Sequence, residues 1–181
     1  MLQPNKILII RFSSLGDLIL TSPIFRELRR IFPGANLNLL TSVGFGDVLD
    51  NNPHLDRIIK HPRKENFEQL NQLIEELQAE DFDLIYDAHR SIRSRWIVSR
   101  LTAFGMKRKP AVWKINKRTL NRKLLIHFVW NSLQQGFSQR EQWLLPLKQH
   151  APHGLNASTE LFPDQEDIGL IETLMNEQNL L

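Results

Sequence analysis

The block at residues 13–17 holds the side chains of this 181-residue chain that are best placed to do chemistry. Ser13 and Ser14 offer hydroxyl groups, Gly16 leaves the backbone accessible, and Asp17 supplies a carboxylate. An apolar run at residues 7–10 precedes the block, and an amphipathic segment follows it. This order is typical of a buried strand that delivers a turn and a helix N-terminus to the sheet edge where open α/β folds bind ligands. We therefore expect the block to meet a substrate in that crevice.

The elements that must position this block follow from the alternation of apolar patterns along the chain. Strands are expected at residues 6–11, 36–41, 56–60, 82–87 and 110–113, and helices at 17–32, 66–80, 90–104, 119–133, 138–149 and from Pro163 to Leu181. A β-α-β-α order of this kind predicts an α/β, Rossmann-like fold, with a mostly parallel sheet and helices on both faces.

Two helices carry more specific expectations. Pro23 either kinks the helix at 17–32 or marks a helix that begins near Ser22, and the sequence leaves both open. The helix at 90–104 is expected to bury a set of apolar side chains, namely Ile92, Trp96, Ile97, Leu101 and Phe104.

The charge of the chain is unevenly distributed. The formal net charge is only +3, but residues 90–123 carry many Lys and Arg and no acidic residue. A basic segment indicates an anionic partner, such as a phosphorylated glycan, a nucleic acid or a membrane surface. A solvated cationic face without a partner is the alternative.

The composition argues against several classes of protein, namely disulfide-linked, membrane-spanning, secreted and metal-binding proteins. Cysteine is absent, which excludes disulfides and thiolate chemistry. No apolar run approaches the roughly 18–20 residues of a membrane span, and no secretory signal is visible, so we expect a cytoplasmic protein. The histidines lack metal-ligand spacing, and we expect no metal site. Residues 44–46 suggest a dinucleotide fingerprint, but Leu49 stands where its third glycine belongs.

Three segments resemble the ADP-heptose:lipopolysaccharide heptosyltransferases. The first is the Ser-Ser-Leu-Gly-Asp turn at 13–17 with Pro23 after it; the others are Phe-Pro-Gly-Ala at 32–35 and the strand at 83–88 with its basic helix. The resemblance implies the N-terminal, acceptor-binding half of a GT-B glycosyltransferase, and it covers most of the chain. Asp17 matches the proposed general base of the family, which removes the proton of an acceptor hydroxyl as that oxygen attacks the donor.

The resemblance also implies where the acceptor is held. Arg63 and Lys64 correspond to a basic loop that meets the acidic inner core of lipopolysaccharide, and further arginines match positions that bind acceptor carboxylate or phosphate, among them Arg93, Arg118 and Arg140. Arginine suits this role because its fork binds oxyanions in a bidentate way. His89 follows the fourth strand, where ligands gather, although a structural hydrogen bond explains it equally well.

The same family implies an organisation into two domains. Residues 1–158 would form the acceptor-binding domain, and residues 159–181 a linker and helix leading towards a donor-binding domain that this chain lacks. We therefore expect the chain alone to be inactive.

The resemblance also implies the substrates and partners. ADP-heptose would be the donor substrate, with no further cofactor. The acceptor would be of the Kdo–lipid A type, nucleic acid is not expected, and the helix near 118–130 would contact the inner membrane or, alternatively, pack in a core.

Two other functions remain as alternatives. By sequence alone Asp17 suits helix capping better than catalysis. The chain would then be a non-catalytic basic α/β module that binds an anionic glycan or nucleic acid. A different nucleotide-dependent enzyme, in which Asp17 contacts a ribose, is disfavoured by the missing glycine fingerprint.

Overall fold

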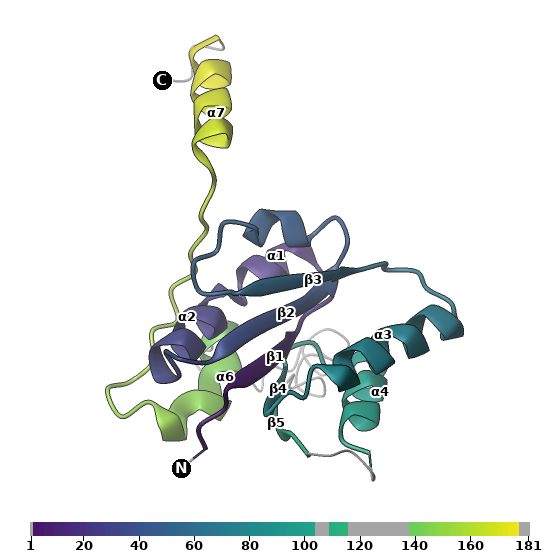
Figure 1. Cartoon of the computed structure of the whole chain (residues 1–181). Helices are drawn as coiled ribbons and strands as arrows, with labels where there is room; N and C mark the ends of the chain where they lie inside the picture. Colours follow the sequence, from purple (N-terminus) through teal and green to yellow (C-terminus); the bar gives the residue numbers. More distant parts are fainter. Residues whose placement is uncertain (1, 104–108, 116–137, 178–181) are drawn as a thin grey trace, which may run out of the picture.

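The centre of the chain is a five-stranded parallel sheet (Figure 1). The computed structural model describes residues 2–103, 109–115 and 138–177. The strands are β1 (Lys6–Ile10), β2 (Asn36–Ser42), β3 (Arg57–His61), β4 (Leu84–Asp87) and β5 (Ala111–Lys114). Their order is β3-β2-β1-β4-β5, and every neighbouring pair is parallel. This is the arrangement of a Rossmann-like fold, and it confirms the fold class and all five predicted strands.

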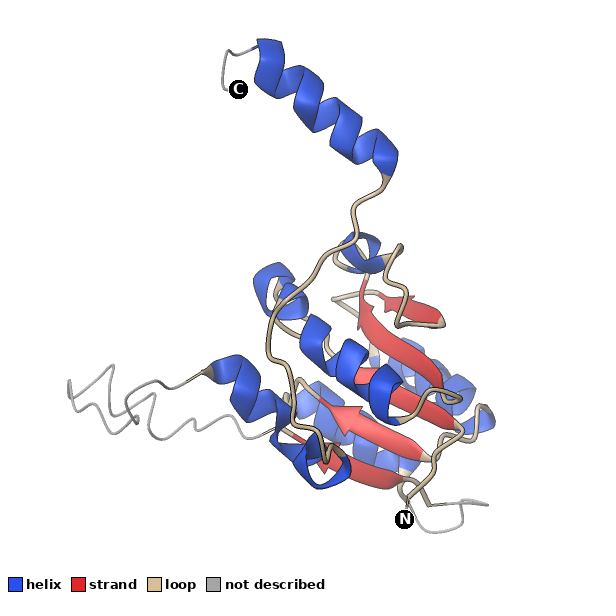
Figure 2. Ribbon diagram, turned by 90° about the vertical axis from the view of Figure 1, so that its left-hand side faces the viewer, coloured by secondary structure: helices blue, strands red, loops and turns tan. Residues whose placement is uncertain are grey.

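Helices cover both faces of the sheet (Figure 2). They are α1 (Leu15–Ile19), α2 (Ser22–Ile31), η1 (Gly46–Leu49), α3 (Phe67–Ala79), α4 (Ile92–Leu101), α6 (Gln139–Leu144), η2 (Leu145–His150) and α7 (Gln165–Glu177). Ile7 and Ile9 of β1 pack with α1, α2 and α6, whereas Leu8 and Ile10 pack with α3 and α4. A strand covered on both faces is apolar throughout, which explains the unbroken run in the sequence.

The segment 17–32 forms two helices, so the expectation of one continuous helix is wrong. The break falls at Leu20 and Thr21, and α2 begins at Ser22 with Pro23 in its first turn. Proline lacks a backbone N–H, and the first turn of a helix is where that donor has no partner anyway. The second interpretation of Pro23 is therefore the correct one.

Helix α4 differs from the prediction in the residues that it buries. Ile97 and Leu101 are buried against β4 and α3, as expected. Ile92 is 89% exposed and Trp96 42% exposed, because they lie on the face of α4 opposite the buried Ser94, Ile97, Val98 and Leu101. Phe104 and the helix predicted at 119–133 lie outside the described residues.

The segment that follows η2 is tied to α2 by side chains. Arg26 donates to the carbonyl oxygens of Asn156 (2.8 Å) and Ser158 (3.1 Å) and pairs with Glu160 at 2.8 Å. Helix α7 then extends away from the sheet in both views and has no buried residue (Figures 1 and 2). The predicted last helix is confirmed, and the domain boundary at residue 158 stays a prediction. Within the described residues, no helix is both long and apolar enough to cross a membrane.

Candidate functional site

The loops that hold the predicted site residues lie at one edge of the sheet. Each loop follows a strand of a parallel sheet, so Asp17, Arg63, Lys64 and His89 all come after carboxyl ends. Two contacts join these loops directly. Arg11, just after β1, donates from Nη1 to the carbonyl oxygen of Ala88 at 2.5 Å, and the rings of Phe12 and His89 lie 5.7 Å apart.

The carboxylate of Asp17 is held by the guanidinium of Arg11. Arg11 Nη2 lies 2.7 Å from Asp17 Oδ2, and the Arg11 side chain is only 4% exposed whereas that of Asp17 is 37% exposed. The guanidinium also lies 4.7 Å from the ring centre of Trp143 in α6. Burial lowers the pKa of Arg11 from its ordinary value, and the negative charge of Asp17 opposes that change. Arg11 therefore reaches the crevice as a fixed cation that faces Asp17.

Asp17 also takes part in the local structure of α1. Ser14 is the N-cap, and Asp17 occupies the third helical position, where its Oδ2 accepts from the Ser14 backbone N–H (3.4 Å) and hydroxyl (3.3 Å). These bonds are long and weak compared with the 2.7 Å ion pair to Arg11. Oδ1 of Asp17 has no hydrogen bond or ion pair to any described residue. One carboxylate oxygen is thus anchored, and the other is available to a ligand.

The turn after β4 is shaped by a buried carboxylate. Oδ1 of Asp87 accepts the backbone N–H groups of His89 (3.1 Å) and Arg90 (2.7 Å), and Oδ2 accepts the hydroxyl of Ser94 at 3.2 Å. Arg90 has a left-handed backbone with φ of 49°, and its Nη1 donates to the Ile115 carbonyl oxygen at 3.0 Å. Asp87 therefore fixes the path of the chain that carries His89 to the edge.

The predicted cations differ in their surroundings. Arg63 and Lys64 are exposed and form no hydrogen bond or ion pair with a described residue. Arg93, in contrast, is engaged by Glu65 of the same loop at 2.5 Å. Arg140 lies in α6 one turn before Trp143, so it shares the helix that closes on Arg11. Arg118 lies outside the described residues. Ser13 is half-buried, and Ser14 and Gly16 are exposed.

Sequence reasoning missed three residues that build this site: Arg11, Glu65 and Trp143. A signal existed for Arg11, because a cation that directly follows four buried apolar residues needs an acidic partner. Trp143 gave no signal beyond a helical pattern. Its backbone carbonyl accepts the hydroxyl of Tyr86, whose pKa is raised by burial, and this contact joins α6 to the sheet.

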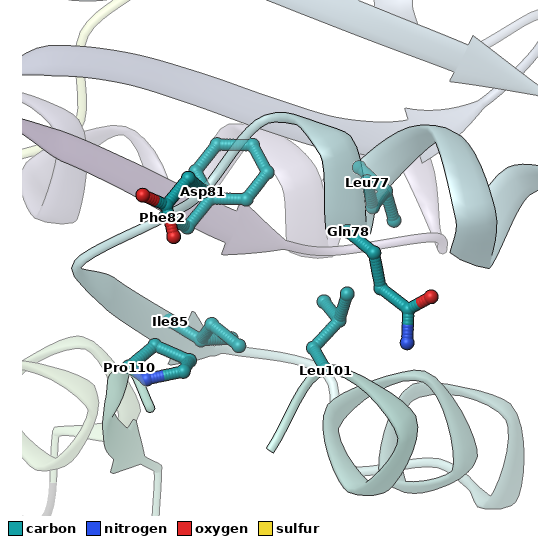
Figure 3. Close-up of a pocket in the computed structure, with 7 residues that line it drawn as sticks. All are labelled: Leu77, Gln78, Asp81, Phe82, Ile85, Leu101 and Pro110. Carbon is teal, nitrogen blue, oxygen red and sulfur yellow. The ribbon is translucent and has the colours of Figure 1, made fainter. Parts of the chain in front are cut away.

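One hollow among the described residues lies away from Asp17. The pocket in Figure 3 is on the amino side of β4 and β5, opposite the site edge, and its lining is mostly apolar: Leu77, Gln78, Asp81, Phe82, Ile85, Leu101 and Pro110. Within the part of the chain that the structure describes, no three acidic or histidine side chains gather as metal ligands would.

Comparisons with curated proteins identify relatives of the chain. It is 25% identical over 156 residues to lipopolysaccharide heptosyltransferase 1 of Pseudomonas aeruginosa and 29% identical over 111 residues to the enzyme of the same name from Escherichia coli K12. The chain is a relative of the lipopolysaccharide heptosyltransferases. The matches cover 78% and 56% of this chain but only 44% and 34% of those heptosyltransferases. No protein-family model matches the chain.

Solved structures show the same fold. A glycosyl transferase family 9 protein from Veillonella parvula superposes on 99% of this chain with a TM-score of 0.71 and 17% identity. E. coli heptosyltransferase WaaC with ADP-2-deoxy-2-fluoro heptose superposes on 85% of it, with a TM-score of 0.61 and 20% identity. Only 51% and 50% of those chains are covered, so this chain spans about half the length of its structural neighbours.

Proposed function

We propose that this chain is the N-terminal, acceptor-binding half of a heptosyltransferase-type glycosyltransferase, with Asp17 as the general base. The observation that carries the proposal is the Asp17 carboxylate itself. One oxygen is anchored 2.7 Å from a buried arginine, and the other is without a partner among the described residues at the ligand-binding edge of a Rossmann-like sheet. A base must be oriented before it can act, and this ion pair supplies the orientation.

The proposed reaction transfers heptose from ADP-heptose to the inner core of lipopolysaccharide. Asp17 Oδ1 takes the proton of an acceptor hydroxyl while that oxygen forms a bond to the anomeric carbon. The bond from that carbon to the diphosphate breaks on the opposite face, so ADP leaves with the electron pair and the configuration inverts. No metal or further cofactor takes part in this scheme. The nucleotide would be held by a second domain, of which the described residues form no part.

The acceptor would be held by cations around the same edge. Arg63 and Lys64 are exposed, and Arg140 stands in the helix that contacts Arg11. Such groups bind carboxylate and phosphate, the charged groups of a Kdo–lipid A type acceptor. Ser13, Ser14, Gly16 and His89 would line the crevice beside them, as would Arg118.

We extend the proposal to contact with an anionic lipid surface on the cytoplasmic face of the inner membrane. Phe67 and Ile92 begin α3 and α4 at the site edge and are 68% and 89% exposed, and the rings of Phe67 and Trp96 lie 6.5 Å apart. Exposed cations, including Arg95 and Arg100, surround this apolar group, and two exposed acids, Glu68 and Glu75, also lie near it. Exposed apolar side chains with arginines beside them fit an anionic bilayer.

Vesicle co-sedimentation of the 181-residue chain tests this proposal. The vesicles contain phosphatidylcholine alone, phosphatidylcholine with phosphatidylglycerol, or phosphatidylcholine with a Kdo-bearing lipid A. We expect the strongest binding to the Kdo-bearing vesicles, with loss of that preference in Arg63→Glu/Lys64→Glu. Phe67→Ser/Trp96→Ser should weaken binding to both anionic surfaces, whereas the control Leu170→Ser in α7 should not. Equal binding to Kdo-bearing vesicles and to duplex DNA would favour the non-catalytic basic module instead.

A further inference from the structure

Glu65 is a buried carboxylate in the loop between β3 and α3. Its side chain is only 8% exposed, and both of its oxygens are engaged. Oε1 lies 2.5 Å from Nε of Arg93, and Oε2 contacts Nε2 of His61. A carboxylate of this burial is stable only when it is paired and hydrogen-bonded, so its partners define where the loop can lie.

The partners of Glu65 come from elements on both sides of the loop. His61 is the last residue of β3, and Arg93 stands in the first turn of α4. Arg93 also donates from Nη2 to the carbonyl oxygen of Pro62 at 3.1 Å, and its guanidinium lies 4.0 Å from the ring centre of Phe12. The short stretch between these contacts contains Arg63 and Lys64. The loop is therefore fastened before and after its two cations.

The ion pair with Glu65 changes the role predicted for Arg93, which was to bind the acceptor. Burial lowers the pKa of Arg93, and the negative charge of Glu65 opposes that change. Its Nε lies at ion-pair distance from Glu65 without hydrogen-bond geometry, its Nη2 donates to Pro62, and one face of the guanidinium meets Phe12. An anion that approached Arg93 would meet the negative charge of Glu65, whereas Arg63 and Lys64 are exposed and pair with no described carboxylate.

We propose that Glu65 and Arg93, with His61, are positioning residues that hold Arg63 and Lys64 at the site edge to receive an anionic acceptor. This inference rests on the proposed function, in which those two cations bind the acceptor. It assigns Arg93 to the support of the loop and not to the acceptor itself. The strength with which the loop binds the acceptor then depends on Glu65, a residue with the same charge sign as the acceptor.

The variant Glu65→Gln gives opposite expectations under electrostatics alone and under this proposal. Removing a negative charge beside two cations, and releasing Arg93 as a third, should strengthen the binding of any anion. Under the proposal, loss of the contact between Glu65 and Arg93 should instead weaken anion binding, because Arg63 and Lys64 must then lose conformational entropy when the anion binds. Glu68→Gln is the matched control, since it removes an exposed carboxylate three residues away that pairs with no described residue.

The experiment measures binding of the full 181-residue chain to phosphatidylcholine vesicles with Kdo-bearing lipid A. We expect Glu65→Gln to weaken binding about tenfold, Glu65→Asp to fall between it and the unchanged chain, and Glu68→Gln to bind at least as well as the unchanged chain. In an Arg63→Ala/Lys64→Ala background, Glu65→Gln should have no further effect. Unchanged or stronger binding by Glu65→Gln would overturn the proposal.

Limited trypsin digestion keeps the inference separate from the proposed function. Trypsin cleaves after Arg63 and Lys64, and a fastened loop resists it. We expect Glu65→Gln to raise the cleavage rate at these two bonds about tenfold or more, with the melting temperature of the rest of the chain nearly unchanged. If Glu65→Gln is cleaved faster but the unchanged chain binds no vesicles, the acceptor-binding role of Arg63 and Lys64 is contradicted, while the role of Glu65 in holding the loop is supported. Unchanged cleavage would contradict the fastening itself.

Discussion

Oδ2 of Asp17 makes both a local contact, to Ser14 within α1, and a tertiary contact, to Arg11. The N-cap of α1 is Ser14 and not Asp17, so the capping interpretation was wrong in its position; Asp17 accepts from Ser14 at the third helical position. The shorter contact, however, runs to Arg11, which is anchored on Ala88 and Trp143. Those anchors belong to the fourth strand's exit and to α6, so no pattern near Asp17 could reveal them. The sequence places the carboxylate and offers a signal for Arg11 as a cation after a buried strand, but it does not reveal the anchors that fix Arg11.

A double-mutant cycle on Arg11 and Asp17 tests whether the ion pair is real and coupled. Asp17→Asn leaves the buried guanidinium of Arg11 without its charged partner, so we expect it to lower the free energy of unfolding by about 1–2 kcal/mol. Arg11→Met/Asp17→Asn should cost less than the sum of the single changes. We expect a coupling of only about 0.5–1 kcal/mol, because the Asp17 side chain is 37% exposed to screening water.

Urea unfolding of the four proteins provides the measurement. A plain local cap would not involve Arg11, and the two changes would then add to within about 0.3 kcal/mol. Additivity would remove the basis for treating Arg11 as the group that orients Asp17.

Elements with a strong periodicity were predictable, and their orientation was not. The buried strands and α3 lie within one or two residues of the expected bounds, because an apolar run between turn residues determines them. The break between α1 and α2 could not be predicted, because the sequence allowed Pro23 either inside one helix or in the first turn of a second helix. Ile92 and Trp96 are exposed because α4 turns the face with Ile97 and Leu101 towards the sheet, and the apolar residues on the other face gave no sign of which set would be buried.

At the edge opposite the site, Glu80 joins two strands to the end of α3. Its carboxylate contacts Lys6 at the start of β1 and lies 2.7 Å from Arg57 at the start of β3. These cations, Lys6 first, lower the pKa of Glu80 below the ordinary 4.5. The stability that the pairing contributes is therefore complete above about pH 4.5 and is lost as the pH falls through the lower pKa of the folded state.

Glu80→Gln should accordingly destabilise the chain at pH 7, by less than about 1 kcal/mol because the groups are partly exposed. The difference from the unchanged chain should shrink towards zero as the pH falls from 5 to 3. Glu75→Gln, on the same helix but unpaired among the described residues, is the control for loss of charge. Urea unfolding across this pH range gives the comparison. A Glu80→Gln deficit that stays constant with pH would show that the ion pairs do not stabilise the fold.

At the scale of the whole molecule, the chain is one Rossmann-like layer structure followed by a fastened segment and a projecting helix. Glu160 pairs with both Arg26 and His54, so the segment before α7 is held against the body up to that point. The exposed apolar residues of α7, Leu170 and Ile171 among them, face solvent. Structural neighbours extend to about twice this length, and one of them was solved with a nucleotide-sugar analogue. Under the proposed function, acceptor binding and the base belong to this chain, and donor binding belongs to another domain.

The central claim is that Asp17 removes the acceptor proton, and the rate of heptose transfer tests it most directly. The measurement uses this chain joined to the part of E. coli lipopolysaccharide heptosyltransferase 1 that it does not match, with ADP-heptose and a Kdo-bearing acceptor. Asp17→Asn keeps the size of the side chain and an oxygen that can accept from Ser14, but it removes the base. We expect turnover to fall about 10²–10⁴-fold, with little change in acceptor binding and the protein still folded at the assay temperature. Full turnover by Asp17→Asn would contradict the account and leave Asp17 as a structural residue of α1.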